Sequence, residues 1–427
     1  MKTLASERPP GGPSRRMASG PIVVAATAGI ALGMALGVVV GDRMVAAASR
    51  KSEVERLPIP VLTVPGTASV AEPPTLAERP VRNIVLLIGD GMGLAQIAAG
   101  RILAKGTEGR LHFERFPTVG LVTTHPAAAV VTMSDAAASS LATGTKVEIG
   151  RISTDEAGRP LPTLLEVLRD SGWATGMATT TRITDATPAA FAAHVPSRRD
   201  EARIAEQLSE ARVDLLIGGG RSYFLPHKST LGRHQAGRDL LAEMRQRGVE
   251  VVDDASGLEG ATRLPTAALF GREPQQTNPR SPTVEAMASK ALELLSQSGR
   301  PFFLLLEEEE IDTAAHANDG RRMSAALVRF DDAAAAAAAF AARDGETLVV
   351  VLGDHATGGL TIDSRSRAGE LALLWGSREH TGEPVPVFAY GPPAAAARFS
   401  GMHDNTEIPH LVAAALGFEF PRPVATQ

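Results

Sequence analysis

The residue types best suited to chemistry in this chain are carboxylates and imidazoles that follow, or closely precede, short apolar runs. They are Asp90 after Ile84–Ile88; Glu307, Asp312 and His316 after Phe302–Leu306; Asp354 and His355 after Leu348–Leu352; and His380 before Val385–Tyr390. Asp312 and His316 are four residues apart and would share one face of a helix. Carboxylates with imidazoles and no thiols suit zinc or a similar divalent ion. The number of such ligands indicates more than one ion.

Serines in the Ala-rich stretch Val131–Lys146 are a second candidate for chemistry. This stretch holds Ser134, Ser139 and Ser140 and is predicted to begin a helix. Because Ser and Ala at a helix start usually serve capping and packing, the stretch alone does not identify a nucleophile. A serine hydroxyl also needs a base or a metal to activate it. No histidine stands in this stretch, so a metal is the expected activator.

Short apolar runs alternate with helical patterns from Val81 onward. The runs are Ile84–Ile88, Val213–Ile217, Phe302–Leu306, Leu348–Leu352 and Val385–Tyr390, and the helical segments include Thr163–Asp170, Asp200–Arg212, Arg238–Arg247 and Val284–Ser298. This alternation predicts an α/β fold, a layered domain with a large, mostly parallel central sheet flanked by helices. In such a sheet, functional residues collect at the carboxyl ends of the strands, where the candidate ligands stand.

Composition and charge narrow the class of protein. The 427 residues are 44% hydrophobic and 21% charged, which is typical of a globular protein with a large core. The formal net charge of −5 gives no indication of nucleic-acid binding. The absence of cysteine excludes disulfides, thiol catalysis and Cys-ligated zinc.

The N-terminal region predicts export. Residues 21–41 contain no charged residue, and Arg15 and Arg16 precede them, as in a signal peptide or membrane anchor. As an apolar helix, residues 22–40 would span roughly 28 Å, about one hydrocarbon thickness. We therefore interpret residues 1–48 as a signal peptide or anchor, residues 49–80 as a Pro-rich linker and residues 81–427 as the main domain. The expected location is the periplasm or the cell exterior. The sequence does not decide whether residues 1–48 are cleaved off.

Seven motifs occur in an order typical of one enzyme family. They are Asn83–Gly93, the Ser/Ala stretch Val131–Lys146, Ile183–Ala190 with His194 and Arg198, Gly218–Phe224, Ile311–Asp312 with His316, Asp354–His355, and His380–Gly382. On these motifs the chain from about Val81 to Phe418 resembles the alkaline phosphatase family. One such motif alone would be weak support, but seven in the family's order are strong.

The resemblance implies two zinc ions and one magnesium ion. One zinc would take Asp312, His316 and His380; the second would take Asp90, Asp354, His355 and the nucleophile; the magnesium would take Asp90, Thr187 and Glu307, with Asp185 supporting its water shell. By the same resemblance Arg198 binds the phosphate and Ser134 is the nucleophile. Ser139 and Ser140 are then packing residues.

The implied function is hydrolysis of small phosphate monoesters through a phosphoserine intermediate on Ser134. One alternative keeps the metals and changes the substrate: a phosphodiesterase or phosphonate hydrolase of the same superfamily. The other is a phosphate- or metal-binding protein with weakened catalysis, tethered to a membrane by residues 21–41. No nucleic-acid partner is expected. The sequence does not decide the oligomeric state; a homodimer is one possibility, because relatives are often dimers.

Departures from the family pattern bear on phosphate binding. The family has Asp directly before the nucleophile, where it supports the arginine, but this chain has Met133 there and Asp135 just after. We therefore expect Arg198 to be more mobile or differently tethered, with Asp135 as a candidate support. Residues 308–310 are glutamates where relatives have small or neutral side chains, and we expect them to be solvated. Thr313 offers no charge where relatives often carry Lys, His or Trp.

Overall fold

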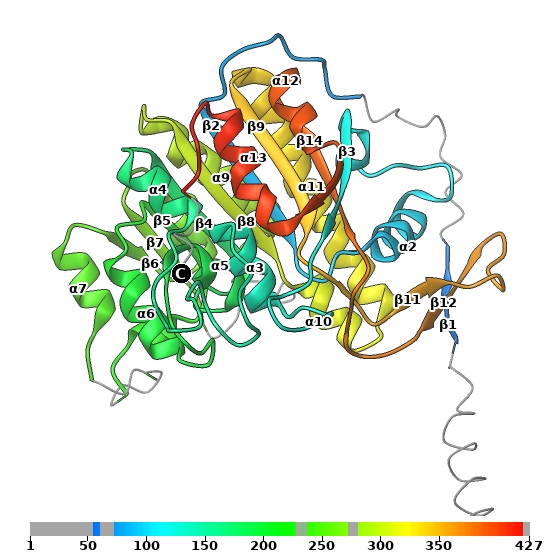
Figure 1. The fold of residues 1–427 in the computed structure, drawn as a ribbon, viewed down its shortest axis with the longest axis horizontal. Helices are drawn as coiled ribbons and strands as arrows, with labels where there is room; N and C mark the ends of the chain where they lie inside the picture. The colour runs from blue at the N-terminus through cyan, green and yellow to red at the C-terminus, as the bar shows by residue number, and fades with distance from the viewer. Residues whose placement is uncertain (1–53, 60–71, 228–232, 234–236, 272–280, 422–427) are drawn as a thin grey trace, which may run out of the picture. The chain divides into compact units, whose positions relative to one another are not determined.

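A mixed, mostly parallel sheet of ten strands forms the centre of the part of the chain that the structure describes (Figure 1). This computed structural model describes residues 54–59, 72–227, 233, 237–271 and 281–421. The strands of this sheet are β2 (Asn83–Gly89), β3 (Thr118–Thr123), β4 (Ala174–Arg182), β5 (Leu215–Gly219), β6 (Glu250–Val252), β7 (Thr266–Leu269), β8 (Phe302–Glu308), β9 (Thr347–Gly353), β14 (Val385–Tyr390) and β15 (Gly401–Asp404). Their order is β15-β3-β14-β9-β2-β8-β4-β5-β7-β6, and β14 alone among them runs antiparallel to its neighbours. The predicted α/β architecture is confirmed.

β2 shows why the central strands read as continuous apolar runs. Ile84, Leu86 and Ile88 pack into the core on one face of the sheet, and Val85 and Leu87 pack into the core on the other. All five side chains are at most 1% exposed. A strand that is buried on both faces needs apolar residues at successive positions, so a short apolar run is its signature.

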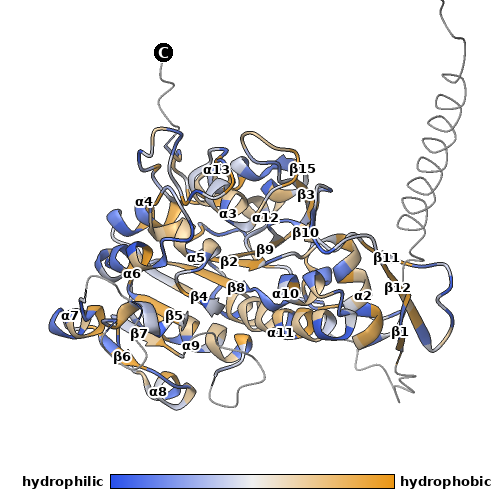
Figure 2. Cartoon of the chain, turned by 90° about the horizontal axis from the view of Figure 1, so that it is seen from below, coloured by the Kyte–Doolittle hydropathy of each residue, from blue (hydrophilic) through white to orange (hydrophobic). Residues whose placement is uncertain are grey.

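Helices cover both faces of the sheet (Figure 2). The core on one face includes residues of α2 (Leu94–Lys105), α8 (Ala255–Gly260), α9 (Val284–Gln297), α10 (Glu310–His316) and α11 (Gly320–Asp344). The core on the other includes residues of α3 (Ser134–Thr143), α4 (Leu164–Asp170), α5 (Ala186–Ala192), α6 (Glu201–Glu210), α7 (Leu240–Gln246), α12 (Pro393–Ala396) and α13 (Ile408–Ala415). The Ala-rich run 333–339 lies in α11, and its small side chains Ala333, Ala334, Ala337 and Ala338 belong to the core on the first of these faces.

The predicted linker must be corrected near its start, because Val54–Pro58 forms a strand, β1. β1 pairs antiparallel with β12 (Glu370–Trp375), which also pairs with β11 (Leu360–Ile362). The Glu55 carboxylate fixes this strand by accepting hydrogen bonds from Gly320 N at 3.0 Å and Trp375 Nε1 at 2.9 Å. The surrounding prolines suggest a linker, and the partner strand is too distant in the sequence to reveal the pairing.

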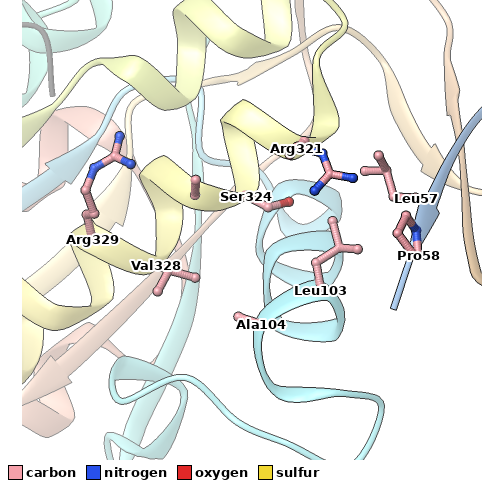
Figure 3. Close-up of a pocket in the computed structure, with 9 residues that line it drawn as sticks. Leu57, Pro58, Leu103, Ala104, Arg321, Ser324, Val328 and Arg329 are labelled. Carbon is pink, nitrogen blue, oxygen red and sulfur yellow. The ribbon is translucent and has the colours of Figure 1, made fainter. Parts of the chain in front are cut away.

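An apolar pocket of about 440 Å³ lies beside β1 (Figure 3). Its walls come from β1, α2 and α11, and include Leu57, Pro58, Leu103, Ala104, Arg321, Ser324, Val328 and Arg329. Among the described residues, no carboxylate or imidazole lines this pocket, so it does not match the chemistry that the sequence predicts.

The predicted signal peptide or anchor, residues 1–48, lies outside the described residues. Among the described helices, none is long and apolar enough to cross a membrane. Export and anchoring therefore stay predictions.

Candidate active site and metal centre

Three neighbouring strands bring the first candidate ligands together. β2 lies between β8 and β9, and its last residue, Gly89, is paired with Glu308 of β8 and with Gly353 of β9. Asp90 and Asp354 follow directly after these strand ends. Because parallel strands end at the same edge of a sheet, both carboxylates lie at one edge.

Two short elements add the remaining imidazoles. α10 follows β8 and carries Asp312 and His316 one turn apart. A two-stranded ribbon of β10 (Ala356–Thr357) and β13 (His380–Thr381) pairs Thr357 with His380. These elements place the side chains of Asp312, His316 and His380 beside the strand ends.

Gly91 allows α10 to approach the end of β2. Its φ is +73°, a left-handed conformation that glycine adopts without steric cost. A Cβ at this position would lie 2.8 Å from Asp312 Oδ1. Gly91 N also donates a hydrogen bond to Asp354 Oδ1 at 3.1 Å. The glycine after Asp90 is therefore required by the close packing of the site.

The first group of potential metal ligands is Asp312, His355 and His380, whose ligand atoms lie within 4.8 Å of one another. His316 lies beside them: its Nε2 is 3.1 Å from Asp312 Oδ2 and 3.0 Å from His380 Nε2. The three residues predicted to hold one zinc thus meet at one point of the site.

The second group is Asp90, Asp354 and His355, also within 4.8 Å of one another. His355 Nε2 lies 3.2 Å from Asp90 Oδ1 and 3.3 Å from Asp354 Oδ2. Ser134 Oγ, on the first residue of α3, lies 3.2 Å from the same ring nitrogen. The structure therefore places the predicted nucleophile against this second group.

The other two serines of the same stretch lie inside α3. Ser140 Oγ donates a hydrogen bond to Ala136 O at 2.8 Å, and Ser139 Oγ accepts one from Ser153 N at 2.9 Å. Both side chains are fully buried. Their hydroxyls serve backbone groups, as expected of packing residues, whereas Ser134 faces the ligands.

Hydrogen bonds to backbone carbonyls fix the imidazoles. His380 Nδ1 donates to Thr132 O at 3.0 Å, and His316 Nδ1 donates to Arg378 O. Because Nδ1 carries the hydrogen, Nε2 of a neutral ring presents its lone pair to the ligand group. Burial lowers the pKa of His380 and lowers the pKa of His355 to about 3, so these two rings are neutral, as metal-ligating imidazoles must be. The hydrogen bond to Asp312 raises the pKa of His316 to about 9, so His316 must give up a proton to bind a metal.

Both groups border a small polar pocket of about 150 Å³. Its lining residues are Asp90, Met133, Ser134, Asp185, Ala186, Thr187, Arg198, Glu307, Glu309, Asp312, His316 and His380. Burial, together with neighbouring carboxylates, raises the pKa of Asp90 well above its usual value; burial raises the pKa of Glu307 to about 8. Five carboxyl groups and a single guanidinium line this pocket, so the carboxyl groups oppose one another's ionisation and the site favours added cations.

Buried oxygen atoms without partners show that these residues fit divalent cations. Asp90 Oδ1, Asp354 Oδ2 and Thr187 Oγ1 are buried and make no hydrogen bond within the described ranges. Each such atom costs about 1–3 kcal/mol when left unsatisfied, and more when charged. Carboxylates with neutral imidazoles suit zinc, and an oxygen-only set suits magnesium. Bound cations would satisfy these atoms and offset the negative charge.

Comparison with known proteins decides the family. The sequence matches the family described as Alkaline phosphatase over residues 81–374 and 366–418. This chain belongs to the alkaline phosphatase family. It is 35% identical to streptomycin-6-phosphate phosphatase of Streptomyces griseus, with 84% of this chain and 95% of that protein covered. It is 32% identical to the alkaline phosphatase of Escherichia coli K12, with 84% and 90% covered.

Solved alkaline phosphatases share the fold. The enzyme from the Antarctic bacterium TAB5 is 29% identical and superimposes with a TM-score of 0.71, covering 80% of this chain and 99% of that one. A TAB5 variant with Mg bound in its M3 site is also 29% identical, with a TM-score of 0.69 and the same coverage. As an alkaline phosphatase, the present protein is a phosphoric monoester hydrolase whose site takes divalent metal ions.

In this alkaline phosphatase, two carboxylates hold Arg198. Its Nη1 donates to Asp135 Oδ2 at 3.2 Å, and its Nη2 donates to Asp185 Oδ1 at 2.8 Å. Asp135 is 1% exposed and its other oxygen accepts hydrogen bonds from Ala136 N and Gly150 N. Arg198 is therefore held by the residue after Ser134, whereas the family pattern uses the residue before it. This geometry does not leave the guanidinium mobile.

Thr187 and Glu307 line the pocket but belong to neither close group of ligands. Thr187 is 1% exposed, near the start of α5. Glu307 is near the end of β8, where its Oε2 accepts a hydrogen bond from Thr179 Oγ1 at 2.6 Å. The residues predicted to hold magnesium thus line the same pocket as Asp90.

The prediction that residues 308–310 are solvated is wrong for Glu308. Its side chain is fully buried, and Oε1 accepts hydrogen bonds from Thr180 Oγ1 at 3.0 Å and Glu310 N at 3.2 Å. The reason is that Glu308 still belongs to β8, which has a neighbouring strand on each side. Burial raises its pKa to about 7. Glu309 is partly exposed and lines the pocket.

Thr357 contacts the ligands and was missed by sequence reasoning. Its Oγ1 donates a hydrogen bond to Asp312 Oδ1 and lies 3.3 Å from His355 Nδ1. The side chain is fully buried. The sequence signal that could have identified it is a hydroxyl residue two positions after His355. Its contacts orient one carboxylate and one imidazole of the first ligand group.

Proposed function

We propose that this enzyme hydrolyses phosphate monoesters through a phosphoserine intermediate on Ser134. The observation that carries the proposal is the position of Ser134 Oγ, which lies in the polar pocket 3.2 Å from His355 Nε2. The same pocket holds Arg198, a planar cation suited to binding two phosphate oxygens. A nucleophile and a phosphate-binding group thus face one space.

The proposed cofactors are two zinc ions and one magnesium ion. Asp312, His316 and His380 would hold one zinc; Asp90, Asp354, His355 and Ser134 the second; and Asp90, Thr187 and Glu307 the magnesium. When bound, such ions activate oxygen nucleophiles and neutralise the charge of the transferring phosphoryl group.

The chain's own residues position the substrate and receive the phosphoryl group. Arg198 binds two phosphate oxygens while Asp135 and Asp185 hold its guanidinium from behind. Ser134 Oγ gives up its proton and forms a bond to phosphorus as the bond from phosphorus to the alcohol oxygen breaks, and the alcohol takes up a proton as it leaves. Water then attacks the phosphoserine and releases phosphate, which restores the Ser134 hydroxyl. The N-terminus of α3, where Ser134 stands, favours the negative charge that gathers there.

The test is Ser134→Ala in the metal-loaded enzyme, with an aryl phosphate as substrate. Turnover should fall by at least about 10³-fold, because the group that accepts the phosphoryl is gone. Zinc and magnesium contents should stay near those of the wild type. Ser140→Ala changes another serine of the same helix that does not line the pocket; it is the matched control and should keep turnover within about threefold. Unchanged turnover of Ser134→Ala would place the nucleophile elsewhere.

The tether of Arg198 favours monoesters over the diesterase alternative. A firmly held guanidinium binds two non-bridging oxygens of the phosphate. A monoester has a third non-bridging oxygen left for the metals, whereas a diester has none. Pure enzyme should therefore hydrolyse an aryl monoester faster than the matching diester, as kcat/KM shows. A faster diester would favour the alternative function.

Export is also part of the proposal and rests on the sequence. The charge-free residues 21–41 after Arg15 and Arg16 support a signal peptide or anchor, and hence a periplasmic or extracellular enzyme. Fractionation of cells that express the full chain, followed by mass determination of the enzyme, would show its location and whether residues 1–48 remain.

A further inference from the structure

We infer that Glu309 is the outer carboxylate of the third, oxygen-lined cation position, a role that the family resemblance gives to Asp185. The inference rests on the proposed function, because it concerns the same metal centre. It gives a role to a glutamate that stands where relatives carry small or neutral side chains.

Asp185 has no acceptor position left for a cation or its water shell. Its Oδ1 accepts hydrogen bonds from Arg198 Nη2 and Ala186 N, both at 2.8 Å. Its Oδ2 accepts from Arg182 Nη2 at 2.6 Å and from Thr181 Oγ1 at 3.4 Å. A carboxylate offers about four acceptor positions, so these four bonds fill them. Despite burial, the two guanidinium charges hold the pKa of Asp185 below its usual value.

Glu309 has an oxygen to spare at the same pocket. Its Oε1 accepts a hydrogen bond from Thr313 Oγ1, while Oε2 accepts none from the described residues. Glu309 lines the pocket together with Thr187 and Glu307. The unused oxygen of Glu309 and the residues expected to hold magnesium thus border the same small pocket.

The residues expected to hold magnesium, together with Glu309, offer only oxygen donors. Asp90, Thr187, Glu307 and Glu309 line the same pocket with carboxylate and hydroxyl oxygens, whereas the imidazoles belong to the two zinc groups. The buried Thr187 Oγ1 lacks a hydrogen-bond partner among the described residues, which independently indicates a ligand in this pocket. Magnesium prefers oxygen donors and usually keeps several of its waters. Glu309 Oε2 is the free acceptor that can hold those waters.

Met133 explains why the roles are redistributed. Without a carboxylate before Ser134, Arg198 relies on Asp135 and Asp185. Asp185 is therefore committed to arginine binding, and another carboxylate must face the cation. Glu309 supplies it from the residue just before α10.

Three single variants of the full-length, zinc-loaded enzyme test this assignment: Glu309→Gln, Glu310→Gln and Asp185→Asn. Magnesium binding is measured by calorimetry, with bound metals counted by elemental analysis. Glu309→Gln should bind magnesium about 10–100-fold more weakly, the usual effect of removing an outer-shell partner, with zinc content unchanged. Glu310→Gln, whose side chain pairs with Arg322, should match the wild type. Asp185→Asn should bind magnesium within about threefold of the wild type but bind inorganic phosphate more weakly.

A Glu309→Gln enzyme with wild-type magnesium affinity would overturn the inference. So would an Asp185→Asn enzyme that loses magnesium affinity about tenfold or more, or a wild type that binds zinc but no magnesium. None of these results bears on the phosphoserine mechanism, which Ser134→Ala tests separately.

Discussion

At the scale of single residues, phosphate affinity should depend on Asp135 because it holds Arg198. Asp135→Asn keeps the shape of the side chain but replaces the charge that faces Arg198 Nη1. We expect inorganic phosphate to inhibit this variant about three- to tenfold more weakly, the effect of losing one charge-assisted hydrogen bond while Asp185 retains the other. The inhibition constant, measured with an aryl phosphate as substrate, checks this.

Glu148→Gln is the matched control for that measurement, because Glu148 pairs with Arg151 in the neighbouring loop and does not line the pocket. It should leave phosphate inhibition unchanged. Equal inhibition of Asp135→Asn and wild type would show that Asp185 alone positions the arginine.

The ligand side chains could be predicted from the sequence, whereas the contacts among supporting residues could at most be suggested. Asp90 and Asp354 follow apolar runs, and parallel strands bring such positions together. By contrast, Asp135 was only a candidate support for Arg198, because the pairing depends on where the loop after α5 returns. The burial of Glu308 depends on which residue ends β8. Both facts belong to the tertiary structure.

At the scale of elements, the partly buried pair of Glu166 in α4 and His194 just after α5 should stabilise the packing of these helices in a defined pH window. The two side chains lie 3.1 Å apart. Burial opposes both charges, but Glu166 raises the pKa of His194, and His194 lowers the pKa of Glu166. The His194 contribution is full below its unfolded pKa of about 6.5 and is lost as pH rises through its folded pKa. The Glu166 contribution is present above about 4.5 and is lost as pH falls through its folded pKa.

His194→Gln should therefore lower Tm by about 1–3 °C at pH 5.5 and by less at pH 9. Thermal melts of the metal-loaded enzyme at both pH values measure this, with the exposed His227→Gln as control. The same loss of Tm at both pH values would mean that the pair contributes packing without charge.

The buried parallel strands were the elements most readily predicted, because burial on both faces leaves a run of apolar residues. β14 was also visible as a run, but its antiparallel direction is set by the neighbours β3 and β9. The edge strand β1 was missed because Pro58 and the prolines after it indicate a linker, and its hydrogen bonds go to the distant β12.

At the scale of the whole molecule, the folded unit should begin at β1, earlier than the family match that starts at residue 81. A chain of residues 54–427 keeps Glu55 on Gly320 N, at the start of α11, and Leu57 in the core. A chain of residues 81–427 loses both and should melt at least about 4 °C lower. Thermal melts of the two purified chains check this, and equal Tm values would show that β1 adds no stability.

The most direct test of the account is to trap the phosphoryl group on the enzyme. Wild-type, metal-loaded protein is mixed with an aryl phosphate, quenched in acid during turnover, digested and mapped by mass spectrometry. We predict one phosphorylated peptide, modified at Ser134, that is absent from Ser134→Ala. Turnover of the ester with phosphate on a different residue, such as Ser139, or with no phosphorylated peptide at any quench time, would contradict the account.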